Sequence, residues 1–258
     1  MNELFWIDEG TGPPVVLLHG GYLDHHMWDE QIAALAATCR VIAPDARGHG
    51  RSANATGPFR FTDDLAALLR HLDTGPAALV GVSMGGGIAV DTALEHPDLV
   101  RALVVSGVGT SEPYFTDAWN LQVIEAWTTA AAAGDLDAAV EAFTAAAAGP
   151  YRTLDDLDPA IVSRLRAMTR GTMGKHTVGE PDQVVPVTDT WSRAAGIDVP
   201  VLAVNGALDS ADHLGMAERL ARTVKNGRAV TIDGAAHYPN LDRPEEFGAI
   251  LTSFLRQH

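Results

Sequence analysis

Residues 77–87 read AALVGVSMGGG, and the rest of the chain can be interpreted around this stretch. The apolar run that opens it is typical of a buried strand, and the residues that follow are typical of a helix. A Gly-x-Ser-x-Gly sequence between a strand and a helix forms a sharp turn with the serine hydroxyl exposed at its tip. Gly81 and Gly85 have no Cβ, so the strand and the helix can approach closely. We therefore predict that Ser83 is a nucleophile, with a flexible loop as the alternative for the pentapeptide taken alone.

The size and charge of the chain restrict the classes of protein to consider. Its 258 residues are enough for one large α/β domain with a full core. A formal net charge of −15 argues against nucleic acid and anionic membranes as partners, because both attract a basic surface. Cys39 is the only cysteine, which excludes an intrachain disulfide, and its place beside an apolar run predicts a small buried side chain.

The N-terminal residues MNELFWID contain neither the basic segment nor the long apolar stretch of a signal peptide. No apolar run elsewhere approaches the length that spans a bilayer. The sequence thus predicts a cytoplasmic protein, a monomer or a homodimer, with no nucleic-acid or membrane partner.

Short apolar runs alternate with helical patterns along most of the chain. This alternation predicts an α/β fold, a mostly parallel, doubly wound sheet of about seven or eight strands that is covered on both faces. The runs that we interpret as strands are residues 4–7, 15–18, 41–43, 77–82, 103–105, 199–206 and 229–232. Ligands of such sheets bind at the carboxyl ends of the strands, so polar residues that directly follow a strand are the candidates for the site.

The alternation stops between residues 113 and 195. This segment lacks a clear buried strand and is rich in alanine and aromatic residues. We predict that residues 113–195 form a helical cap, inserted after the sixth strand of the sheet. Residues 1–112 and 196–258 would then form the core domain.

A serine hydroxyl is a poor nucleophile at neutral pH, so it needs a base and a carboxylate that orients the base. Of the ten histidines, His237 follows the last predicted strand and is the candidate base. Asp209 follows the strand at 199–206 and is the candidate acid, with Asp212 as the second choice. The chain order Ser, Asp, His is the one that accompanies this serine motif.

Other histidines are interpreted as structural or solvated. His19 ends a strand and is followed by two glycines, which favours a role in organising the loop. His25 and His26 are adjacent and have no partners at metal-ligand spacing, so we expect them to be solvated and expect no metal or cofactor. His213 is expected to face solvent near Asp212, and His176 is a candidate for contact with a substrate.

Together with the GVSMG sequence, four further motifs give the chain a resemblance to the α/β-hydrolase superfamily over almost its whole length. They are the HGG sequence at 19–21, the loop DARGHGRS at 45–52, Leu208-Asp209 and Ala236-His237-x-Pro239. Small 3-oxoadipate enol-lactonases, non-haem haloperoxidases and esterases are the most similar members. The resemblance implies that the cap is a lid, and that the Gly21 N–H joins the Met84 N–H in an oxyanion hole. The short N-terminus departs from the usual opening hairpin, so fewer than eight strands are expected.

The function that follows is hydrolysis of a carboxylic ester or lactone of a small, apolar or aromatic substrate through an acyl-enzyme. A carbon–carbon hydrolase or a perhydrolase would use the same triad, and a noncatalytic ligand receptor on this fold is a second alternative. Six large side chains are the candidates for the substrate pocket: Tyr22, Trp119, Trp127, Met168, Met173 and Trp191.

Overall fold

The computed structural model describes residues 4–258. Its sheet has seven strands in the order β1-β3-β2-β4-β5-β6-β7. The pair β1 and β3 is antiparallel and every other neighbouring pair is parallel, so the predicted fold class is confirmed. The strands are β1 (Trp6–Glu9), β2 (Pro14–Leu18), β3 (Arg40–Pro44), β4 (Ala77–Val82), β5 (Val100–Ser106), β6 (Val201–Gly206) and β7 (Gly227–Ile232).

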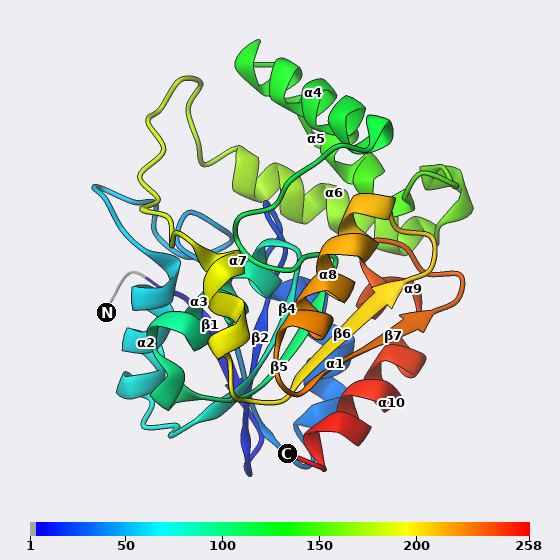
Figure 1. Ribbon diagram of the computed structural model, residues 1–258. Helices are drawn as coiled ribbons and strands as arrows, with labels where there is room; N and C mark the ends of the chain where they lie inside the picture. Colours follow the sequence, from blue (N-terminus) through cyan, green and yellow to red (C-terminus); the bar gives the residue numbers. More distant parts are fainter. Residues whose placement is uncertain (1–3) are drawn as a thin grey trace.

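Helices connect the strands and cover both faces of the sheet (Figure 1). The α-helices are α1 (Asp29–Leu35), α2 (Phe61–His71), α3 (Met84–Glu95), α4 (Ala118–Ala132), α5 (Leu136–Thr144), α6 (Pro159–Met173), α7 (Thr190–Arg193), α8 (Ala211–Thr223), α9 (Pro239–Asp242) and α10 (Pro244–Leu255). Short 3₁₀ helices are η1 (His25–Trp28), η2 (Pro97–Leu99), η3 (Ala145–Ala148), η4 (Leu154–Asp156) and η5 (Ala194–Gly196). Among the described residues, no helix has the length and the apolar character that a membrane crossing requires.

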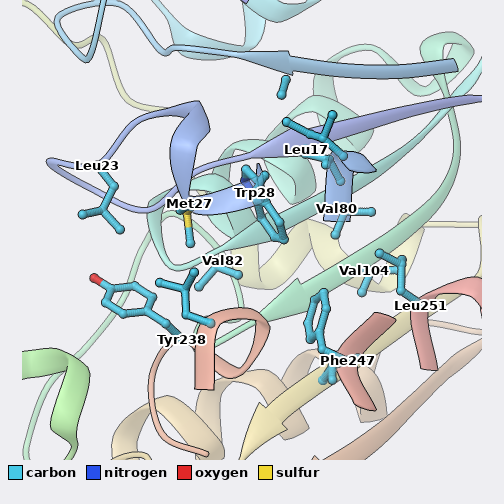
Figure 2. Close-up of a cluster of buried hydrophobic side chains, with 14 of the residues drawn as sticks. Leu17, Leu23, Met27, Trp28, Val80, Val82, Val104, Tyr238, Phe247 and Leu251 are labelled. Carbon is cyan, nitrogen blue, oxygen red and sulfur yellow. The ribbon is translucent and has the colours of Figure 1, made fainter. Parts of the chain in front are cut away.

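Apolar side chains form two large clusters, one on each face of the sheet. Leu17 of β2 belongs to the first and its neighbour Leu18 to the second, because successive residues of a strand face opposite sides. Figure 2 shows Leu17 in the first cluster together with Trp28 and Phe247. The second cluster takes residues from α2, α3 and α8. Burial on both faces explains why the central strands read as continuous apolar runs and not as alternating ones.

The carboxyl end of β4 lies in the middle of the sheet, between β2 and β5. All six residues of β4 are buried. Since β2, β4, β5 and β6 are parallel neighbours, the loops that follow them emerge at the same edge. This arrangement brings the polar residues that follow the separate strands close to Ser83.

One expectation about the sheet is corrected. The helical segment that carries α4 to α7 follows β5, the fifth strand, and not the sixth. Among the described residues a single strand, β1, precedes β2, so five strands come before the helical segment. Figure 1 shows α4, α5 and α6 together beyond the edge of the sheet.

The segment between β5 and β6 is attached firmly to the core. Leu165 and Met168 of α6 are buried in the first apolar cluster, while α7 packs against α3. The Lys175 ammonium donates to the carbonyl groups of His49 and Gly50, and the Asn54 side chain donates to the Lys175 carbonyl. Division of the chain at residues 113 and 195 stays a prediction.

Candidate active site

Ser83 occupies the turn between β4 and α3 with a backbone conformation that is rare for a residue with a side chain. Its φ is 54° and its ψ is −120°, which is a strained combination. A Cβ placed on Gly81 would lie 2.2 Å from the Gly85 carbonyl oxygen, and one on Gly85 would lie 2.1 Å from the Leu18 carbonyl oxygen. Both positions therefore exclude any side chain, and the tight turn that holds Ser83 depends on them.

Asp209 and His237 form a buried hydrogen-bonded pair. The residues follow β6 and β7, and His237 Nδ1 lies 2.9 Å from Asp209 Oδ2. Burial alone would raise the pKa of the Asp209 carboxyl, but the facing His237 and His213 hold that pKa well below its usual range. Asp209 is thus an ionised acceptor for the His237 Nδ1–H, which leaves Nε2 as the basic nitrogen of the ring.

Ser83 and His237 both lie against the end of β5. The Ser83 N–H donates to the Ser106 carbonyl at 2.8 Å. The next residue, Gly107, has a φ of 67°, and a Cβ on it would lie 2.7 Å from His237 Cε1. The His237 ring therefore rests directly on the Gly107 backbone. Gly20 lies between the same two parts of the chain. A Cβ placed on Gly20 would lie 3.8 Å from Ser83 Cβ and 3.4 Å from the ring of Tyr238, the residue after His237.

The two predicted oxyanion donors lie on facing loops. A Cβ on Gly21 would be 3.9 Å from Met84 Cβ. Met84 is the first residue of α3, where N–H groups have no partner within the helix. His19 fixes the Gly21 loop: its Nδ1 donates to the Gly20 carbonyl at 2.8 Å, and its Nε2 accepts from the Ala46 N–H at 2.9 Å. Burial lowers the pKa of His19, so the ring is neutral and holds this tautomer.

His213 was expected to face solvent, and the structure corrects this expectation. Its Nδ1 lies 3.0 Å from Asp209 Oδ1, and its ring is stacked on His237 with 4.2 Å between the ring centroids. Burial lowers the pKa of His213 and the neighbouring His237 acts in the same direction, while Asp209 opposes them. The position of His213 four residues after Asp209, in the first turn of α8, places both side chains on one side of that turn. That spacing was the available signal in the sequence.

A cavity of about 370 Å³ opens beside Ser83 and His213. Its wall combines apolar residues with polar ones, which include Arg60, Thr62, Asp91, Thr110 and Ser111. The apolar part includes Ile88, Val108, Pro113, Phe115, Val184, Val185, Pro186, Val187 and Met216. The volume is that of a small-molecule site.

The six side chains that were expected to line the pocket are not among those that line this cavity. Tyr22 and Trp127 pack against Phe143 in a third, smaller apolar cluster. Met173 belongs to the same cluster and Met168 to the first. Trp127, Met168 and Met173 belong to α4 and α6, whose packing places them in these clusters, and Tyr22 reaches Trp127 from the loop after β2.

The two tryptophans that remain also have other surroundings. Trp119 follows the N-cap Asp117, whose carboxylate accepts from the Trp119 N–H. Trp191 donates from Nε1 to the Glu112 carbonyl at 2.9 Å and lies under the Arg219 guanidinium. The cavity wall is supplied instead by the loop at 184–187, which has no helical period and was therefore not selected from the sequence.

Other candidates are placed outside the triad. The Asp212 carboxylate accepts from the N–H groups of Thr116 and Asp117, so it anchors the start of the helical segment. His176 bonds to Glu180 and to the Gly48 carbonyl, and it does not line the cavity.

His25 was expected to be solvated, but it is buried. Its Nδ1 and its backbone N each lie 2.8 Å from Asp45 Oδ1. The loop at 45–52 needs this contact because Asp45 is buried inside it and also accepts from the Arg51 N–H. His26 is exposed, as expected, and Cys39 is buried.

Within residues 4–258, two groups of side chains carry donor atoms close enough to share a cation. One is Asp209, His213 and His237, and the other is Asp24, His25 and His26, in each of which the donor atoms lie within 4.8 Å of one another. In both groups, these side chains already take part in hydrogen bonds. Asp209 accepts from both of its histidines, and Asp24 caps the start of η1.

Comparison with known proteins agrees with the fold. The sequence model of the alpha/beta hydrolase fold family matches residues 13–244, and the chain belongs to this family. A pimeloyl-[acyl-carrier protein] methyl ester esterase of Neisseria meningitidis is 31% identical, over 93% of both chains.

Solved structures extend the likeness to three dimensions. A thermophilic esterase from Thermogutta terrifontis has a TM-score of 0.79 and 26% identity, over 98% of this chain and 93% of that one. An enol-lactonase from Burkholderia xenovorans LB400 has a TM-score of 0.78 at 24% identity, over 98% of this chain and 96% of that one, and supports the fold. The relatives support a hydrolase of the esterase type.

Proposed function

We propose that the protein is a serine hydrolase that cleaves a carboxylic ester or lactone of a small, largely apolar substrate through an acyl-enzyme. The observation that carries the proposal is the Asp209–His237 pair, which lies at the same sheet edge as the strained Ser83. The esterase names of relatives at 31% and 26% identity support ester hydrolysis as the reaction.

In this mechanism, Ser83 Oγ attacks the carbonyl carbon of the substrate while His237 Nε2 takes the hydroxyl proton. Asp209 holds the ring in the required tautomer and stabilises the imidazolium form. The N–H groups of Gly21 and Met84 receive the oxyanion, at about 3 kcal/mol for each donor. His237 then gives its proton to the leaving alkoxide and activates the water that hydrolyses the acyl-enzyme. Residues 113–195 would act as the cap over the bound substrate.

The alternatives share parts of this arrangement. A carbon–carbon hydrolase or a perhydrolase would use the same Ser83, Asp209 and His237, so only a substrate panel separates them from an esterase. A noncatalytic receptor would need the cavity but not the buried Asp209–His237 pair. The position of this pair at the same sheet edge as Ser83 favours an enzyme, because groups with strongly shifted pKa values beside a cavity are typical of catalytic sites.

The test compares wild type with Ser83→Ala on p-nitrophenyl esters, lactones and vinylogous diketones. We expect Ser83→Ala to lower kcat by about 10⁴–10⁶-fold with an unchanged circular dichroism spectrum. A fluorophosphonate probe should label the wild type at Ser83 and should label Ser253→Ala equally, because Ser253 is exposed on α10. Retention of most of the esterase rate by Ser83→Ala would reject Ser83 as the nucleophile. A folded wild type that does not react with the probe would favour the receptor.

A further inference from the structure

The cavity beside Ser83 follows one face of α3. Its wall takes Ser83, Met84, Gly87, Ile88 and Asp91 from this part of the chain. Residues at this spacing share one side of a helix. Asp91 is eight residues after Ser83, so it lies about 12 Å further along the helix axis. The cavity therefore connects the nucleophile with a carboxyl group more than two helical turns away.

Three side chains at this distant part of the wall have unpaired polar atoms. Arg60 Nε, Thr62 Oγ1 and Asp91 Oδ1 are buried and have no hydrogen-bond partner within residues 4–258. All three residues line the same cavity. A buried polar atom without a partner costs about 1–3 kcal/mol, so three around one cavity indicate a position where a ligand supplies the missing bonds.

The charges that surround Asp91 already have partners. Arg60 Nη2 bonds to Glu95 Oε2 at 2.8 Å, and the other oxygen of Glu95 accepts from Arg193. Glu112 accepts from the hydroxyl and the N–H of Thr190. The Asp91 carboxyl is bonded through one side only: the hydroxyl and the N–H of Ser111 donate to it and oppose the rise of its pKa, while Oδ1 has no partner among the described residues. Asp91 is 4% exposed.

Protonation of Asp91 reflects the same surroundings. Burial raises the pKa of the Asp91 carboxyl to about 6, and the nearby Glu112 and Glu95 act in the same direction. A ligand with a full positive charge would face the Arg60 guanidinium, and a ligand carboxylate would face Asp91. A neutral group that both donates and accepts a hydrogen bond meets neither repulsion.

We propose that Arg60, Thr62 and Asp91 form a substrate subsite that binds a hydroxyl group at the far end of an apolar acyl chain whose ester carbonyl is at Ser83. The hydroxyl donates to Asp91 and accepts from Arg60 Nε or from Thr62 Oγ1. The apolar wall between the two ends, with Ile88, Val108 and others, accommodates the chain. The assignment of the ester carbonyl to Ser83 rests on the proposed function.

The first experiment compares kcat/KM for p-nitrophenyl ω-hydroxydecanoate and p-nitrophenyl decanoate. We expect the wild type to prefer the hydroxylated ester by about tenfold or more, since a site built for a hydroxyl discriminates against its absence. Asp91→Ala should reduce this ratio of rates to about one. The exposed Asp98→Ala, in η2 at the end of α3, is the matched control and should keep the wild-type ratio. Equal rates in the wild type, or a stronger preference for ω-amino or ω-carboxy esters, would overturn the subsite.

The second experiment separates the subsite from the reaction. Binding of ω-hydroxydecanamide and decanamide to Ser83→Ala is measured by calorimetry, and we expect tighter binding of the hydroxylated amide by about tenfold. Adding Asp91→Ala should remove this difference. Ester hydrolysis without any hydroxyl preference would reject the subsite and leave the hydrolase proposal standing. A hydroxyl preference in binding, without hydrolysis of any ester by the wild type, would reject the hydrolase and leave the subsite standing.

Discussion

Two histidines share the Asp209 carboxylate, and this sharing determines how basic the carboxylate can be. His237 bonds to Oδ2, while Oδ1 accepts from His213 and from the Ser210 N–H. Each bond to the carboxylate removes some of the negative charge that stabilises the imidazolium form of His237. In the proposed mechanism, His213 is therefore a positioning residue that acts through Asp209 and through its stacked ring.

We predict that His213→Phe moves the acidic limb of kcat/KM against pH to higher pH by about 0.5–1 unit. Phenylalanine keeps the stacked ring but removes the donor to Asp209 Oδ1, which leaves a more negative carboxylate beside His237. Asp212 is the other charged group that faces His213, and the substitution leaves it in place. The measurement is a pH series with a p-nitrophenyl ester, with His258→Phe at the exposed C-terminus as the control. A limb that stays in place, or that moves to lower pH, would contradict this role of His213.

Asp91 gives a second prediction at the residue scale, for stability. Its pKa is about 6 in the folded protein and 3.8 in the reference state, so the unfolded chain loses the proton first as pH rises. The contribution of Asp91 to stability is therefore fully present below about pH 4 and is lost as pH rises through about 6. Relative to wild type, Asp91→Asn should gain about 1–2 kcal/mol of unfolding free energy between pH 5 and pH 8.

Urea titrations at the two pH values measure this change, and Asp98→Asn is the exposed control, whose carboxyl is 69% exposed. An equal effect of Asp91→Asn at both pH values would mean that Asp91 does not titrate in this range.

At the scale of elements, the turn between β4 and α3 could be predicted from the sequence because local constraints determine it. Gly81 and Gly85 sit where any Cβ would overlap with backbone atoms, and the apolar run before them fits a strand buried on both faces. Asp209 and His237 were predictable for a related reason. The carboxyl ends of parallel strands converge, so a polar residue that follows a strand reaches the common edge.

Other parts of the site depend on contacts between distant segments, which leave no periodic signal. The loop at 184–187 reaches the cavity because the backbone of Val185 pairs with that of Phe59, which lies far away in the sequence. The large side chains of the helical segment were expected in the pocket on size alone. Tyr22 and Trp127 instead bury one another, since aromatic side chains pack as readily in a core as around a ligand.

The same turn gives a prediction at the element scale. Gly85→Ala should destabilise the protein by about 3 kcal/mol or more, or prevent folding, because its Cβ would lie 2.1 Å from the Leu18 carbonyl oxygen. Gly248→Ala in α10 is the matched control, since no atom lies within 4 Å of a Cβ there. Alanine should stabilise that helix by about 0.5–1 kcal/mol. Chemical denaturation of both variants measures the contrast, and similar effects at the two sites would contradict the close approach at Gly85.

At the scale of the whole molecule, the candidate site and the helical segment between β5 and β6 belong to one packed body. α6 enters the first apolar cluster and α7 packs on α3, while the Lys175 ammonium bonds to the loop at 45–52. Motion of this segment is thus restricted near α6 and α7, and α4 and α5 are the helices with fewer ties to the sheet. The expectations about oligomeric state and partners, which came from charge and composition, stay predictions.

Ser83 directly precedes α3 and Asp91 lies within it, and this has a consequence for selectivity. If the two residues bind opposite ends of one substrate, α3 fixes the distance between the two binding positions. Loosening or replacing α4 and α5 would then change how fast substrates come and go, while the optimum chain length would stay the same. Selection of a different substrate chain length would require moving one of the two binding residues by a helical turn.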